Sequence, residues 1–152
     1  MTAEELKAEI AIEFDALQQV VHELQALRRD LADREPTVRE PTAAAAFLAQ
    51  FYSGIENILK RLSRFHGVPL PTGENWHLDL FKRFCAPGQP PLPVVFDEAL
   101  ARQIGPFRRF RHVVHHGYGF QIDWDRMREG VGHVADVMVN FKERIQAHLE
   151  TI

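Results

Sequence analysis

A single apolar stripe runs through the first 33 residues and restricts the folds that this chain can adopt. Its members recur at spacings of three, four or seven residues, as on one face of an α-helix. Thr2 followed by Glu5 adds the pattern of an N-terminal capping box. We therefore expect a long helix over about residues 2–33 whose apolar face packs against other helices. The members of the stripe are Leu6, Ile10, Phe14 (or Leu17), Val21, Leu24, Leu27 and Leu31.

Four further segments have helical character, and no segment shows the alternating pattern of a β-strand. Pro36 and Pro41 break the chain after the first helix, and Pro106 predicts a kink or a break inside the fourth. The prediction is therefore an all-α, up-and-down helical bundle of about five helices, formed by residues 1–152 as a single domain. The second helix is expected over about residues 42–65 and the third over about 76–84. The fourth should begin between residues 94 and 97 and end at about 115, and the fifth should run to about 149 from a cap at Asp123 or Asp125.

Composition and charge narrow the classes of function. No apolar run approaches the ~20 residues that cross a bilayer, and the acidic N-terminus lacks the basic region of a signal peptide. Cys85 is the one cysteine, so no internal disulfide is possible, which suits a reducing compartment. We therefore expect a cytoplasmic protein with no membrane association. The net charge of −3 argues against a bulk nucleic-acid binder, so any contact with RNA needs a local basic patch.

One such patch lies between Arg102 and Tyr118, a stretch without any acidic residue. A solvated basic face is the simplest interpretation, but this mixture of arginine and histidine also suits cleavage of RNA. Histidine can act as base or acid, since its unperturbed pKa is about 6.5, and the planar arginine fork matches phosphate oxygens. Because RNA supplies its own 2′-OH nucleophile, such a set needs no metal or other cofactor. The patch contains Arg102, Arg108, Arg109, Arg111, His112, His115 and His116.

Helix geometry leaves the choice of catalytic histidine open. Residues four apart share a helix face, so Arg111 is a neighbour of His115, and His112 is a neighbour of His116. Arg111 and His116 are five apart and converge only if the helix ends or distorts near His116. Gly117 makes such an end plausible.

The order of residues in this patch resembles the motif of HepT-type toxins in the HEPN superfamily. That motif is an arginine, a polar residue, three further positions, a histidine, any residue and a tyrosine. Arg111, His112, His116 and Tyr118 occupy its four defined positions. His112 stands where asparagine or aspartate is commoner. The chain length, the helical pattern and the place of the motif before a final helix also resemble that family, which implies a HEPN-like fold.

The resemblance implies a function and partners. HepT-like toxins are homodimeric endoribonucleases of type VII toxin–antitoxin systems, with the active site in a cleft at the dimer interface and 2′,3′-cyclic phosphates as expected products. Carried over, Arg111 holds the phosphate and His116 is the acid or base. The implied partners are an RNA substrate, a second copy of the chain and an MntA-like nucleotidyltransferase antitoxin, which transfers AMP from ATP to Tyr118. Gly117 and Gly119 flank Tyr118, and AMP there would add negative charge and bulk beside the patch.

Other residues and the chain as a whole keep alternative interpretations. His112 and His116 have the spacing of a helical zinc pair, but no Asp, Glu or Cys lies nearby to complete a metal site. The segment 74–77 combines polar and aromatic residues and suits a helix cap, a contact with a base or a partner, or simple packing. The alternative for the whole chain is a non-catalytic helical HEPN module that binds a nucleotidyltransferase partner. The auxiliary or RNA-binding candidates are His112, His115, Arg108 and Arg109.

Overall fold

The computed structural model describes residues 1–116 and 122–152 of the chain. These residues form five helices and only two isolated β-bridges, so the prediction of an all-α, up-and-down helical bundle is confirmed. Within these ranges, none of the helices is both long and apolar enough to cross a membrane. The helices are α1 (Ala3–Asp30), α2 (Arg39–Phe65), α3 (Trp76–Arg83), α4 (Glu98–His116) and α5 (Trp124–Leu149).

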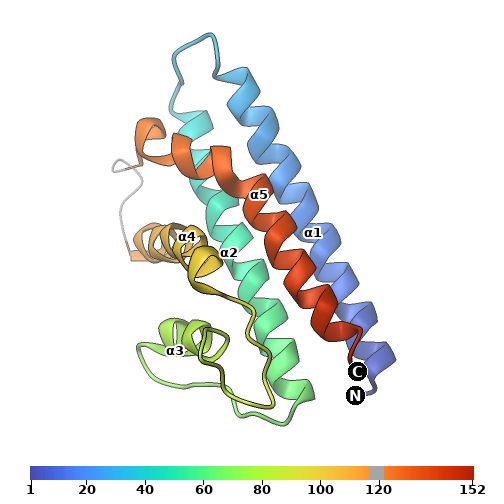
Figure 1. Ribbon diagram of the computed structural model, residues 1–152. Helices are drawn as coiled ribbons and strands as arrows, with labels where there is room; N and C mark the ends of the chain where they lie inside the picture. Colours follow the sequence, from blue (N-terminus) through green and yellow to red (C-terminus); the bar gives the residue numbers. More distant parts are fainter. Residues whose placement is uncertain (117–121) are drawn as a thin grey trace.

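Helix α2 is the centre of the arrangement, because it packs against each of the other four helices. In Figure 1, α1, α2 and α5 lie side by side along the length of the bundle, while α4 crosses beside α2 and is seen almost end-on. Helix α3 lies beside the C-terminal half of α2, on the same side as α4 (Figure 1). The chain termini meet at one end of the bundle, where Lys7 Nζ donates a hydrogen bond to the Ile152 carbonyl at 3.1 Å.

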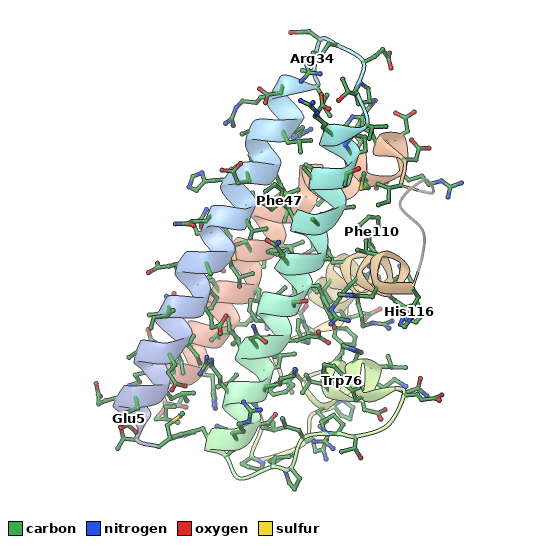
Figure 2. All side chains as sticks on the ribbon, turned by 180° about the vertical axis from the view of Figure 1, so that it is seen from behind. Glu5, Arg34, Phe47, Trp76, Phe110 and His116 are labelled. Carbon is green, nitrogen blue, oxygen red and sulfur yellow. The ribbon has the colours of Figure 1, made fainter. Side chains whose placement is uncertain are left out.

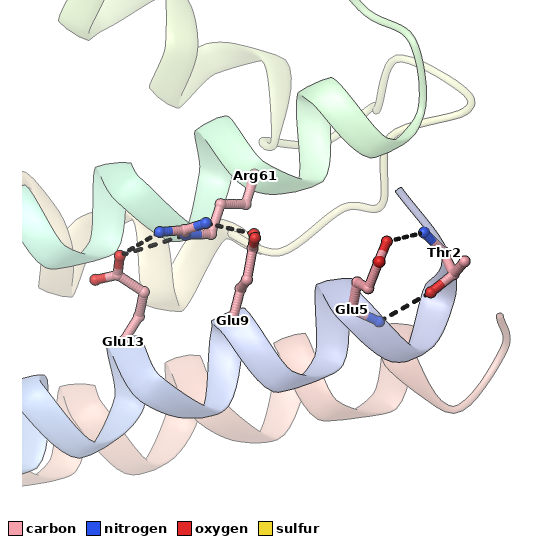
Figure 3. Close-up of polar contacts among 5 residues, drawn as sticks. All are labelled: Thr2, Glu5, Glu9, Glu13 and Arg61. Carbon is pink, nitrogen blue, oxygen red and sulfur yellow. Dashed lines mark hydrogen bonds and ion pairs between the residues drawn. The ribbon is translucent and has the colours of Figure 1, made fainter.

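The predicted stripe of α1 is buried, with both Phe14 and Leu17 among its members. The predicted capping box is also present (Figure 3). The backbone N–H of Glu5 donates to Thr2 Oγ1 at 3.1 Å, and the backbone N–H of Thr2 donates to Glu5 Oε2 at 2.8 Å. The sequence pattern therefore predicted both the buried face of this helix and its start.

The interface between α1 and α2 combines close packing with a small ion-pair network. Gly54 of α2 faces Leu17 of α1 so closely that a Cβ atom at position 54 would lie 2.5 Å from Leu17 Cδ2. Two turns further along α2, Arg61 forms ion pairs with Glu9 and Glu13 of α1 (Figure 3). The absence of a side chain at Gly54 sets the distance at which the two longest helices pack.

Two prolines lie inside helices rather than between them. Helix α2 begins at Arg39, earlier than expected, so Pro41 lies in its first turn. Backbone N–H groups in the first turn have no acceptor within the helix, so the missing N–H of proline costs no helical hydrogen bond there. Pro106 lies inside α4 without breaking it. Its neighbours Ile104 and Phe107 are buried in the core, and this packing compensates for the missing backbone hydrogen bond. The basic patch is therefore carried on one continuous helix as far as His116.

We expect Gly54→Ala to lower the free energy of unfolding by about 1–3 kcal/mol, because the added methyl group overpacks the contact with Leu17. Gly130→Ala is the matched control, since it lies in α5 with open space around its Cβ position. That change should raise the free energy of unfolding by about 0.5–1 kcal/mol through helix propensity. Urea denaturation of both variants measures the difference, and equal effects would contradict the close approach of α1 and α2.

Candidate functional site

Arg111 is the patch residue that turns inward from α4 onto α2. Its Nε donates a hydrogen bond to Ser53 Oγ at 3.0 Å and lies 3.4 Å from Glu56 Oε1, both on α2. The side chain retains 19% of its exposure, so its guanidinium is held by the protein and still reached by solvent. This arrangement suits an arginine that must bind an anion in a fixed position.

The carboxylate of Glu56 is the buried anion of the site, with only 3% of its side chain exposed. A buried carboxylate is costly unless opposite charges and hydrogen bonds compensate for the loss of water. Arg111 faces Oε1, and His77 Nδ1 of α3 lies 2.6 Å from Oε2. Glu56 thus joins α2 to both α3 and α4 through a single carboxylate.

The hydrogen bonds fix the tautomer of His77. Arg111 Nη1 lies 3.2 Å from His77 Nε2, and a guanidinium can only donate hydrogen bonds. Nε2 must therefore accept with its lone pair, and the ring proton must lie on Nδ1, where it is donated to Glu56. In this arrangement the ring nitrogen of His77 that carries the lone pair points at the guanidinium of Arg111.

Aromatic packing fixes the plane of the His77 ring as well. The Trp76 ring lies against it, tilted by 33° with a centroid distance of 3.4 Å, and Lys60 Nζ of α2 lies 4.4 Å from the centroid of the Trp76 ring. For the segment 74–77, the sequence left a helix cap, a contact with a base or a partner, and simple packing as alternatives. In the structure this segment places His77 beside Arg111. Asn75 precedes α3, but its side chain makes no capping hydrogen bond.

The three histidines of the motif divide between two faces of α4. His115 follows Arg111 by one turn, and loss of solvent contact, followed by the positive charges of Arg111 and His116, lowers its pKa. The rings of His112 and His116 lie 4.5 Å apart on an exposed face. Since α4 remains helical through His116, the neighbour of Arg111 on its own helix face is His115. The predicted catalytic role of His116 stays a prediction.

Figure 2 shows that His116 and Trp76 lie on the same side of the molecule, whereas Phe110 points away from α3. On this side of the molecule, the contact between Arg111 and His77 joins α4 to the first turn of α3. Tyr118, the expected AMPylation acceptor, lies outside the described residues.

The other arginines of the patch have different surroundings. Arg108 lies above the Phe81 ring of α3, with 5.7 Å between its Cζ and the ring centroid. Its buried Nε has no hydrogen-bond partner among the described residues. Arg109 is exposed and lies back over Gly105, and Arg102 pairs with Glu98 on the surface. Neither Arg109 nor Arg102 takes part in the Arg111 cluster.

Apart from this cluster, the described residues form a groove between α4 and α5 but no metal site. A groove of about 490 Å³ between α4 and α5 is lined by Phe107, Phe110 and Arg126, among others, but Arg111 does not border it. In the part of the chain that the structure describes, no three His, Cys, Asp or Glu side chains gather as metal ligands. The cluster around Arg111 combines a partly exposed guanidinium with an oriented imidazole.

Sequence reasoning missed Ser53 and Glu56. The available signal was the register of Glu56, which falls on the apolar face of α2 between Tyr52 and Leu59, both fully buried. A carboxylate on a buried helix face needs a cationic partner, and that requirement could have singled it out.

Comparison with known families gives one match. A family model described as a HepT-like protein matches residues 43–152. The matched range contains nearly all of α2 and the whole of α3, α4 and α5, and therefore all the residues of the Arg111 cluster. No curated protein and no solved structure matches the chain.

The cluster predicts energetic coupling between Glu56 and Arg111. We expect Arg111→Met to lower the free energy of unfolding more in the wild type than in the Glu56→Gln variant, because in the wild type it leaves the buried charge of Glu56 without its partner. The difference, which is the coupling energy, should be on the order of 2 kcal/mol. Chemical denaturation of both single variants and the double variant measures it. The same cycle on the exposed pair Glu98 and Arg102 should give a value near zero. A value near zero at Glu56 and Arg111 would contradict the buried ion pair.

Proposed function

Because this chain belongs to the HepT-like family of the HEPN superfamily, we propose that it is a metal-independent endoribonuclease and the toxin of a type VII toxin–antitoxin system. The observation that carries this proposal is the arrangement of Arg111. It is a partly exposed guanidinium held on α2, and it stands next to the imidazoles of His77 and His115.

Cleavage of RNA at such a site needs three functions. A cation must bind the phosphate and stabilise the negative charge that builds up on its oxygens, which is the role of Arg111. A base must accept the proton of the 2′-OH, and an acid must protonate the 5′-oxygen that leaves. The products are a 2′,3′-cyclic phosphate and a 5′-OH end. The family motif assigns acid–base work to His116, and helix geometry makes His115 the alternative.

The partners of the proposed toxin follow from its family. We expect a homodimer in which both copies contribute Arg111 and a motif histidine to one cleft. The exposure of His112 and His116 at the end of α4 supports this, because these rings remain accessible to a second copy. The expected antitoxin is an MntA-like nucleotidyltransferase that transfers AMP to Tyr118. The modification would place negative charge and bulk close in sequence to Arg111 and obstruct an RNA phosphate.

We expect the purified protein to cleave RNA in the presence of EDTA, and Arg111→Ala to slow cleavage by about 100-fold or more, because charge stabilisation at the phosphate is lost. His115→Ala and His116→Ala, assayed side by side, identify the motif histidine that transfers a proton. His22→Ala is the control, because His22 is exposed on α1, outside the site. Cleavage undiminished in Arg111→Ala and in His116→Ala would contradict the family assignment of these residues.

We expect co-expression with a minimal nucleotidyltransferase to add AMP to the protein, seen as an increase in its intact mass. Tyr118→Phe should abolish the addition, because the acceptor hydroxyl is gone. The chain has only one other tyrosine, Tyr52, which is fully buried, so Tyr52→Phe is a matched control that should keep the modification. Addition of AMP to Tyr118→Phe would contradict the assignment.

A further inference from the structure

We infer that His77 of α3 is the general base of the proposed ribonuclease site, and that Glu56 is the residue that positions it. This inference rests on the proposed function. It assigns a catalytic role to a residue outside the motif on α4, within the same copy of the chain that supplies Arg111.

The first argument is the place of the basic nitrogen. Nε2 of His77 carries the lone pair, and it lies 3.2 Å from Arg111 Nη1. A phosphate held by Arg111 would replace Nε2 as the acceptor of this hydrogen bond, because a phosphate oxygen and Nε2 both accept from the guanidinium. The lone pair of Nε2 would then be released next to the bound phosphate. The 2′-OH that attacks this phosphate is on the adjoining ribose, so it comes within reach of Nε2.

The second argument is the way in which the ring is held. Nδ1 donates to the Glu56 carboxylate at 2.6 Å, Nε2 accepts from Arg111, and the tilted Trp76 ring packs against the imidazole. A carboxylate on the far nitrogen selects the tautomer and stabilises the imidazolium that forms when the near nitrogen takes a proton. Glu56 is 3% exposed, so this interaction is screened little by water.

The charges around His77 come from two helices. Helix α2 contributes the Glu56 carboxylate and, above the Trp76 ring, the ammonium group of Lys60. Helix α4 contributes the guanidinium of Arg111 and the imidazole of His115. When a phosphate binds Arg111, its negative charge offsets the cation that faces Nε2.

The proposed step balances as follows. Nε2 of His77 takes the 2′-OH proton, the 2′-oxygen forms a bond to phosphorus, and the bond from phosphorus to the 5′-oxygen breaks. A motif histidine of α4 gives its proton to the departing 5′-oxygen. The products are a 2′,3′-cyclic phosphate and a 5′-OH. Before the next turnover, His77 gives its proton to solvent and the motif histidine takes one from solvent.

The test compares single-turnover cleavage of an RNA oligonucleotide by the full chain and its variants over a range of pH. His77→Asn keeps an amide near Glu56 but has no basic nitrogen. We expect it to slow cleavage by about 100-fold or more and to remove the rise of rate on the acidic side of the pH profile. We expect His77→Ala to recover activity with added imidazole, in proportion to the neutral form of imidazole. His22→Asn on α1 should behave as the wild type.

The outcomes separate this inference from the proposed function. Cleavage by His77→Asn within about threefold of the wild type, while Arg111→Ala is inactive, would overturn the role of His77 and leave the ribonuclease intact. Slow cleavage by His77→Ala that imidazole does not restore, with an unchanged pH profile in His77→Asn, would show that His77 only supports the buried Glu56 and would also overturn it. A wild-type protein that does not cleave RNA would overturn both proposals.

Discussion

The site depends on one interaction, the compensation of the buried Glu56 carboxylate by Arg111 and His77. Each of these side chains comes from a different helix, so the carboxylate ties α3 and α4 to α2. An ionised group in this position is unfavourable by itself and becomes acceptable only when both partners are present. The need to compensate the charge of Glu56 holds Arg111 and His77 in contact with it. It therefore also holds α3 and α4 in place relative to α2.

Helix α2 connects this polar cluster to the apolar core. One face of α2 carries Gly54, whose close contact with Leu17 sets the distance to α1. Ser53 and Glu56, one residue before and two after it, face α4. Two residues that contact Arg111 are thus anchored on α2, the helix that packs against each of the other four. A guanidinium held in this way is preorganised for an anion, since little rearrangement is needed when the anion arrives.

The sequence predicted the fold more completely than the site. Helical periodicity identified the buried face of α1, and local motifs identified its cap, because both depend on residues close together in the chain. The pattern around Arg111 identified the arginine for the same reason. The contacts of Arg111 with Ser53 and His77 span 58 and 34 residues, and no local rule predicts such pairs. Pro41 was misjudged as lying before the second helix, because helix register decides whether a proline ends a helix, and of the kink or break expected at Pro106 the break does not occur.

The geometry of Arg111 is compatible with a structural role and with the proposed binding of a phosphate by the same side chain. Its Nε is directed at Ser53 and Glu56 on α2, whereas Nη1 is directed at His77 on α3. An incoming phosphate has to replace only the contact at Nη1, because Nε can stay on α2. The buried Glu56 would keep Arg111 on one oxygen and His77 on the other throughout. In the proposed mechanism, this exchange would free Nε2 of His77 when a phosphate binds, so that binding and activation of the base would be one event.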